Sequence, residues 1–283
     1  APMIRCLARN RRLMLAAVLT SSSLPRLLSA QDVADEVKSR WEVGAVSSAW
    51  CVHFLVEPSE AQDELTRGYL TLAARDVSSL PAALQRVLAD EPQYADWVPS
   101  QLCVAFPDAV TAEKRVYNRG DGGKPMALLW WGVSAAGAGL DPQAGGLSLR
   151  RLATNSAGLK RQMELERIPM DRITIERGPI KDSDDERIRI RFDNAEIVFD
   201  GHSRQDSTLV AQPVHQLAVL SGTLRHVWVV TTNLQATSVA PLSGALRIQG
   251  KGDIARMLNR SPARLLGTTI SGAGGEVLFR DQP

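Results

Sequence analysis

Residues 187–201, RIRIRFDNAEIVFDG, constrain the fold more than any other stretch, because one turn position explains both faces of two strands. A two-residue turn at Asp193-Asn194 suits these residues, since both tolerate left-handed backbone angles. The resulting cross-strand pairs are Phe192 with Ala195, Ile190 with Ile197 and Ile188 with Phe199 on an apolar face, and Arg191 with Glu196 and Arg187 with Asp200 on a charged face. The sequence therefore predicts a β-hairpin with a buried face and a paired solvent face, rather than a phosphate-binding row of arginines.

More strand patterns surround this hairpin. They lie at 172–176, 224–230, 244–250 and 276–280. Asp253 can cap a short helix over 253–258, which turns Ile254, Met257 and Leu258 inward. The glycine-rich stretches SGAGG (271–275) and GDGGK (120–124) are interpreted as hairpin turns. Short strands separated by Gly and Pro turns are typical of an antiparallel sandwich or a partial barrel.

The N-terminal half mixes helix and strand patterns. Asp32 can cap a helix that carries Val33, Val37 and Trp41 on one face. PAALQRVLADE (81–91) predicts a second helix, with Pro81 in its first turn and Pro92 as its stop. Compact apolar runs predict buried strands at 50–56, 102–106 and 126–133, while 61–76 fits either helix or strand. The predicted fold class is α+β, with a mixed N-terminal half and an antiparallel β-rich C-terminal half.

Four segments follow from these patterns. GAGLDPQAGG (137–146) contains four glycines and a proline and no apolar period, which favours a linker or a long loop. We therefore expect an α/β-mixed domain over 31–136 and a β-rich domain over 147–283. Residues 1–30 form the remaining segment, a signal peptide or an N-terminal tether.

The N-terminal segment has the plan of an export signal. Arginines at 5, 9, 11 and 12 precede a seven-residue apolar run, 13–19, and a small-residue end at Ser29-Ala30. The run is shorter than the roughly 20 residues that a membrane-spanning helix needs. RRLML (11–15) also fits a twin-arginine pattern, so the sequence predicts periplasmic localisation by Sec or twin-arginine export. If the segment is retained, it can lie on a membrane surface as a basic tether.

Charge and cysteine content restrict the possible functions further. Without residues 1–30, the chain keeps 28 basic and 31 acidic residues, a net charge of −3. This balance lacks the basic footprint of a nucleic-acid-binding protein. Cys51 and Cys103 remain in the exported chain, where an oxidising compartment favours a disulfide between them. The alternative is two buried free thiols. No CxxC motif is present.

No pattern in the sequence carries an enzyme's signature. The glycine elbow of serine hydrolases and the phosphate loop are absent, and Ser203 beside His202 is the nearest candidate for a nucleophile. Asp200, His202 and His215 are a conceivable zinc set, while SDDE (183–186) lacks the spacing of a calcium loop. His53 and His226 fit core positions within strands. We therefore predict no catalytic, cofactor-binding or metal site, although paired carboxylates distant in sequence stay open.

Three functions remain in order of preference. The first is an exported, non-catalytic subunit that docks on an integral membrane complex, with Trp130 and Trp131 as interface candidates. The second is a soluble periplasmic carrier whose apolar ligand lies against MALLWWGV and LRHVWVV. The third is a hydrolase without a recognisable motif. An exposed tryptophan pair favours docking, whereas a pair that lines a closed cavity favours a carrier.

The chain also resembles a known family. The arginine-led stretch RNRRLMLAAVL, the lack of a later anchor and the β-rich body are similar to the membrane-extrinsic accessory polypeptides of bacterial photosynthetic complexes. That resemblance implies a protein that stabilises a reaction centre and its antenna through surface contact and binds no pigment itself. It assigns no functional residue.

Overall fold

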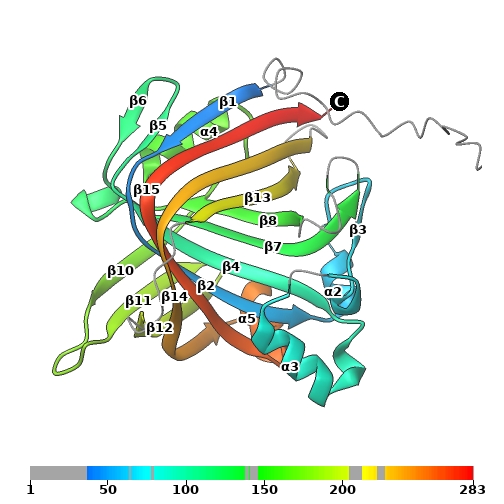
Figure 1. Cartoon of the computed structure of the whole chain (residues 1–283). Coiled ribbons are helices and arrows are strands. Elements are labelled where there is room, and N and C mark those ends of the chain that lie inside the picture. Colours follow the sequence, from blue (N-terminus) through cyan, green and yellow to red (C-terminus); the bar gives the residue numbers. More distant parts are fainter. Residues whose placement is uncertain are drawn as a thin grey trace, which may run out of the picture. The chain divides into compact units, whose positions relative to one another are not determined.

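The computed structural model describes residues 37–63, 65–77, 80–137, 140, 146–203, 212–221 and 227–282 (Figure 1). The predicted signal or tether, residues 1–30, lies outside the described residues. Export and periplasmic localisation therefore stay predictions. Within the described residues, no helix is long and apolar enough to cross a membrane.

Strands dominate the described part of the chain. They are β1 (Val37–Val43), β2 (Val46–Val56), β3 (Tyr69–Thr71), β4 (Val98–Pro107), β5 (Val110–Ala112), β6 (Arg115–Tyr117), β7 (Leu128–Gly137), β8 (Leu147–Thr154), β9 (Asp171–Arg172), β10 (Thr174–Pro179), β11 (Glu186–Phe192), β12 (Ala195–Ser203), β13 (Gln212–Ser221), β14 (Val227–Gly250) and β15 (Arg264–Gln282). The helices are α2 (Pro58–Gln62), α3 (Ala82–Asp90), α4 (Ala157–Leu165) and α5 (Asp253–Arg260). Short 3₁₀ turns lie at Ala74–Asp76, Pro92–Tyr94 and Asp121–Gly123.

Seven of the strands in the described residues close into a ring. Each pairs with the next in the order β2, β4, β7, β8, β13, β14 and β15, and β15 returns to β2. The contact that completes the ring is parallel and short: residues 147–149 of β8 pair with residues 218–220 of β13. The other six contacts around the ring are antiparallel. A closed ring has an inner and an outer face, and each strand presents alternate side chains to them.

The long strand β14 belongs to two sheets. Its first part pairs with β13 in the ring, and its last part, 242–250, pairs with β12 (Figure 1). β12 continues the second sheet through β11 to β10. The inner face of this second sheet packs on the outer face of the ring and on α5, in one apolar cluster that includes Trp131, Phe54, Ile190, Phe199 and Leu258.

The expectation of two structurally different halves is wrong. β15, from the end of the chain, pairs with β2 and with β1 from its beginning. One large mixed sheet therefore uses both halves, and its parallel pairs exclude a purely antiparallel C-terminal half. The strand pairings explain the error, because contacts between residues far apart in sequence leave no local pattern.

The predicted linker joins two neighbouring strands. β7 ends at Gly137 and β8 begins at Leu147, and the two pair in antiparallel register. Most residues between them lie outside the described residues. The sheet therefore continues across the boundary that composition suggested between residues 136 and 147.

The predicted hairpin is confirmed in its full register. β11 and β12 pair Phe192 with Ala195, Ile190 with Ile197, Ile188 with Phe199, Arg191 with Glu196 and Arg187 with Asp200. Asp193 and Asn194 have φ values of 51° and 53°, as a two-residue turn of this hand requires. Two hydrogen bonds of 2.7 and 3.0 Å join the Arg187 guanidinium to the Asp200 carboxylate. The arginine row is a paired solvent face, as predicted.

Four further local predictions can be compared with the structure. Trp41 lies in strand β1, which pairs with β15, and not in a helix. Residues 39, 41 and 43 are buried and alternate with exposed residues, as a strand with one buried face requires. Residues 271–275 continue β15 and form no turn. The helices predicted over 81–91 and 253–258 are present as α3 and α5, although Gly252 rather than Asp253 is the N-cap of α5. The helix α4 was not predicted.

The hairpin generates a prediction about its two faces. Ile190 is fully buried, whereas its neighbour Arg191 is exposed. Ile190→Ala should lower the free energy of unfolding by about 2–5 kcal/mol through the cavity it leaves. Arg191→Ala, the matched control on the opposite face, should cost no more than about 1 kcal/mol. Urea unfolding measures both, and equal losses would contradict a one-sided hairpin.

Cys51 of β2 and Cys103 of β4 lie directly opposite each other, and a disulfide joins them across 52 residues of chain. The Gln101 amide donates a hydrogen bond of 2.8 Å to the Cys103 sulfur. The bond cross-links two adjacent strands of the ring.

We expect the double change Cys51→Ser and Cys103→Ser to lower the free energy of unfolding by about 4 kcal/mol, since it releases the loop in the unfolded chain. Peptide mapping without reductant checks the bond, and urea unfolding with and without reductant measures its effect. Coincident unfolding curves under the two conditions would count against a stabilising disulfide.

Candidate functional site

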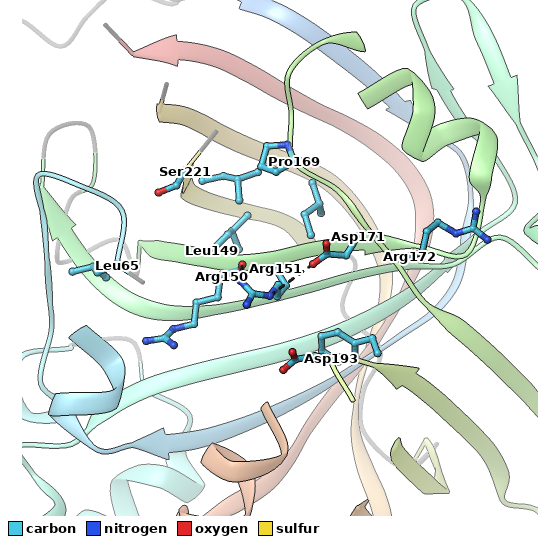
Figure 2. Close-up of a pocket in the computed structure, with 12 residues that line it drawn as sticks. Leu65, Leu149, Arg150, Arg151, Pro169, Asp171, Arg172, Asp193 and Ser221 are labelled. Carbon is cyan, nitrogen blue, oxygen red and sulfur yellow. Dashed lines mark hydrogen bonds and ion pairs between the residues drawn. The ribbon is translucent and has the colours of Figure 1, made fainter. Parts of the chain in front are cut away.

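The candidate site is a cavity of about 740 Å³ that lies where β13 ends beside β8. We call it the arginine-lined cavity (Figure 2). The described residues that line it are Leu65, Leu149, Arg150, Arg151, Leu152, Pro169, Asp171, Arg172, Phe192, Asp193, Leu220 and Ser221. The volume falls within the range of about 300–1,000 Å³ that is usual for small-molecule sites. Charged and apolar side chains share its wall.

A β-bulge in β8 puts two arginines side by side in this wall. Trp131 of β7 pairs with Arg151, and the next residue, Gly132, pairs with Leu149, so Arg150 is the extra residue. A Cβ atom at Gly132 would lie 2.9 Å from the Ser148 carbonyl oxygen, so glycine permits this close approach of the strands. Bulges re-aim side chains and are enriched next to functional sites.

Arg150 is buried and held by several groups. Its guanidinium donates hydrogen bonds to the carbonyl oxygens of Glu60 and Ala61 at the end of α2. It also lies 5.5 Å from the centre of the Trp131 ring, at the distance of a cation–π contact. These contacts fix the orientation of a cation whose burial would otherwise be costly.

The end of α4 directs the chain into the other side of the cavity. Ile168 N–H donates to Met163 O and Arg167 N–H donates to Glu164 O, while Arg167 has a φ of 62°. This is a Schellman C-cap, and the buried side chains of Ile168 and Met163 accompany it in the same apolar cluster. The chain then reaches β9, which pairs in parallel with the end of β8 and adds Asp171 and Arg172 to the wall.

Arg151 and Arg172, the other two arginines of the wall, have acidic neighbours. Arg151 Nε lies 3.8 Å from Asp171 Oδ2, which is longer than a charge-assisted hydrogen bond (Figure 2). Arg172 contacts Asp121, whose carboxylate also accepts a 3.0 Å hydrogen bond from Ala157 N–H at the start of α4. The Ala157 N–H and the Arg172 guanidinium lower the pKa of Asp121. Asp121 therefore stays ionised and holds Arg172 in place.

Asp193, in the turn of the hairpin, lines the cavity from the second sheet (Figure 2). Its Oδ2 accepts a 3.3 Å hydrogen bond from Ile254 N–H in the first turn of α5. Gly252 packs so closely that a Cβ atom there would overlap the Asp193 carbonyl oxygen. The turn that the sequence predicted thus supplies a carboxylate to a cavity that the sequence did not reveal.

The described wall residues carry charges of both signs, and the arginines outnumber the aspartates among them. Three arginines and two aspartates line the cavity, beside the apolar side chains of Leu149, Leu152, Phe192 and Leu220. A guanidinium matches a carboxylate or a phosphate in two-point geometry. The lining can therefore hold an organic anion that also carries apolar surface.

One type of carbonyl chemistry is absent from this site. A lysine amine can attack a carbonyl carbon when burial or a neighbouring cation lowers its pKa. All six lysines lie within the described residues, at positions 38, 114, 124, 160, 181 and 251, and none of them is buried or lines the cavity. The cavity therefore offers cations for binding but no amine nucleophile.

The tryptophan pair does not form an exposed patch. Trp131 is fully buried, and its indole N–H donates to Ser100 Oγ at 3.1 Å. Trp130 is partly buried and lines a second cavity, inside the ring. The expectation that both rings lie at a docking interface is therefore wrong for Trp131, because its side of β7 faces the second sheet.

The described residues do not bring together the zinc ligands considered from the sequence, Asp200, His202 and His215. The Asp200 carboxylate contacts Arg187 and Arg247, and His202 Nδ1 lies 2.6 Å from Asp185 Oδ1. The side chains of His215 and Ser203, and the whole of His226, lie outside the described residues. No group of three or more His, Cys, Asp or Glu side chains in the described part of the chain could hold a metal ion.

His53 lies inside β2, as predicted, on the wall of a small cavity with Gln101, Ser100 and Ser134. Burial lowers its pKa to about 4, because the charged imidazolium is poorly solvated there. The side chain is therefore neutral at physiological pH.

Comparison with known proteins gives distant structural matches. No protein-family model matches the chain, and no curated protein matches it. Among solved structures, an acetoacetate decarboxylase-like enzyme from Sphingomonas wittichii RW1 has 11% identity and a TM-score of 0.48, over 91% of this chain and 98% of that one. The enduracididine biosynthesis enzyme MppR with HEPES bound has 12% identity and a TM-score of 0.47, over 86% of each chain.

A structure of acetoacetate decarboxylase has 10% identity and a TM-score of 0.43, over 86% of each chain. At these identities and TM-scores, the matches transfer no activity, substrate or residue role to this chain. The three proteins are enzymes and not photosynthetic accessory polypeptides. The resemblance to such polypeptides is therefore wrong, and so is the expectation of a non-catalytic extrinsic subunit.

The sequence did contain one signal for the cavity. LSLRRLAT (147–154) places two adjacent arginines inside an otherwise apolar strand, where alternation allows only one of them to face solvent. Such a break in a period-two pattern marks a bulge or a functional position. The residues on the other walls come from four separate segments and leave no pattern of their own.

His53 gives a testable pH dependence. Because its pKa is about 4 in the folded protein and has the ordinary histidine value of 6.5 in the unfolded chain, the unfolded chain binds the proton first as pH falls. His53 should therefore lower the free energy of unfolding by about 3 kcal/mol in total as pH falls from about 7 to below 4, with no contribution above that range. Urea unfolding across this range should show the loss in the native chain and a smaller one in His53→Gln. Identical pH profiles would refute the assignment.

Proposed function

We propose that the protein binds a small organic anion with an apolar portion in the arginine-lined cavity. The observation that carries this proposal is the bulge in β8, which sets Arg150 and Arg151 next to each other in an otherwise largely apolar strand. A buried cation in a cavity wall is costly unless it serves binding or structure. Arg151 reaches the cavity from a partly exposed position, with 26% of its side chain accessible.

The apolar side of the wall supports the proposal that the ligand has an apolar portion. Leu149, Leu152 and Leu220 belong to the main apolar cluster inside the ring and also line the cavity. Burial of apolar ligand surface against them contributes about 25 cal/mol per Å². The arginines then fix the orientation of the charged end.

A matched pair of fluorescent probes tests the proposal. 8-Anilinonaphthalene-1-sulfonate combines an aromatic body with one anionic group, and N-phenyl-1-naphthylamine is the same body without the sulfonate. We expect saturable, salt-sensitive binding of the sulfonate probe. Arg151→Gln should weaken that binding about tenfold, the value of a hydrogen bond to a charged group, and should leave the uncharged probe unaffected.

Arg161→Gln is the control, because Arg161 is exposed on α4 and does not line the cavity. It should leave both probes unchanged. The proposal fails if Arg151→Gln and Arg161→Gln have equal effects, or if the two probes bind native protein with the same affinity. Pentanoate and pentanol, added as competitors, extend the comparison to small ligands, and only pentanoate should displace the sulfonate probe through Arg151.

A further inference from the structure

The ring encloses a second, smaller cavity of about 70 Å³. Each of the seven ring strands contributes at least one side chain to its wall, so this cavity is the interior of the ring; we call it the lumen cavity. Its lining is almost wholly apolar. The volume exceeds the roughly 10–15 Å³ that one water molecule needs and suits a ligand of a few non-hydrogen atoms.

Two tryptophans bring polar groups to this wall. Trp41 of β1 and Trp130 of β7 both line the lumen cavity. The indole N–H of each is buried and has no hydrogen-bond acceptor among the described residues. A buried donor without an acceptor costs the free energy of its lost hydration, so native proteins rarely leave one in place. Here the rings that carry two such donors line the same cavity.

Two other buried tryptophans, Trp131 and Trp228, do have an acceptor for the indole N–H. Trp131 N–H donates to Ser100 Oγ at 3.1 Å, and Trp228 N–H donates to the Arg167 carbonyl oxygen at 3.2 Å. Both of these rings belong to the same sheet as Trp41 and Trp130. Among the described residues, Trp41 and Trp130 are the tryptophans whose indole nitrogen is itself buried and lacks an acceptor.

The lining also limits the charge of a ligand. Its described residues include no ionisable side chain, and their remaining polar members are Gln216 and Thr232, which are paired neighbours on β13 and β14. An ion in these surroundings would lose its hydration without gaining an opposite charge. A neutral molecule with an acceptor oxygen would satisfy an indole N–H and fill the apolar space.

We propose that the lumen cavity is a binding site for a small, uncharged and mostly apolar molecule whose oxygen accepts a hydrogen bond from Trp41 or Trp130. Leu149 and Leu152 line both this cavity and the arginine-lined cavity, so the two sites are neighbours. The inference stands on the indole groups and does not depend on anion binding at the arginines.

Tetrahydrofuran and cyclopentane form the test pair, because they match in shape and differ by one acceptor oxygen. The native protein, labelled with ¹⁵N, is titrated with each probe while the indole N–H signals are followed by NMR. We expect tetrahydrofuran to bind at least threefold more tightly than cyclopentane and to move the Trp41 or Trp130 N–H signal downfield. The Trp131 and Trp228 signals, whose donors are already occupied, should stay in place.

Trp41→Phe and Trp130→Phe assign the signals and remove one donor each while they keep an aromatic ring. At least one of them should reduce the preference for tetrahydrofuran to near that for cyclopentane. Trp228→Phe, whose ring does not line the lumen cavity, should preserve the preference. Equal binding of the two probes, a shift confined to Trp131 or Trp228, or indole groups that contact water only and bind neither probe would each overturn the proposal. The native-protein titration decides the matter even if a variant fails to fold.

Discussion

The short parallel pairing of β8 with β13 is the contact on which the rest of the structure depends. Three residues of each strand complete the ring, and without them the sheet would be open at this point. Closure creates an inside, which the apolar cluster around Leu149, Leu220 and Phe279 fills. The pairing ends at Leu149 and Leu220, and the arginine-lined cavity lies at that end, with both of these residues in its wall.

The bulge at Arg150 connects this architecture with chemistry. A regular strand would alternate its side chains between the ring interior and the second sheet, and two consecutive arginines would then point to opposite faces. The extra residue changes that alternation locally, so Arg150 is fixed by the carbonyl groups near α2 while Arg151 lies near Asp171. The second sheet closes the other side with Asp193, which α5 and Gly252 hold in position.

The two cavities treat polar groups in opposite ways. Around the arginine-lined cavity, hydrogen bonds and ion pairs hold Arg150, Arg172 and Asp193 in defined orientations. In the lumen cavity, two indole donors border apolar side chains without an acceptor among the described residues. The first arrangement is typical of a preorganised charged site, and the second of a site whose ligand supplies the missing partner.

The sequence by itself determined the local elements whose evidence is local. The register of the 187–201 hairpin followed from alternation and a two-residue turn, and α3 and α5 followed from apolar periodicity between stop signals. Only the tertiary structure decided that β15 returns to β1 and β2, that the strands close into a ring, and that Trp131 is buried whereas Trp130 borders the lumen. Ring closure joins residues more than 60 positions apart, and such pairings depend on packing of the whole chain rather than on any short pattern. The cavities arise from that packing, which is why their walls could not be assembled from the sequence.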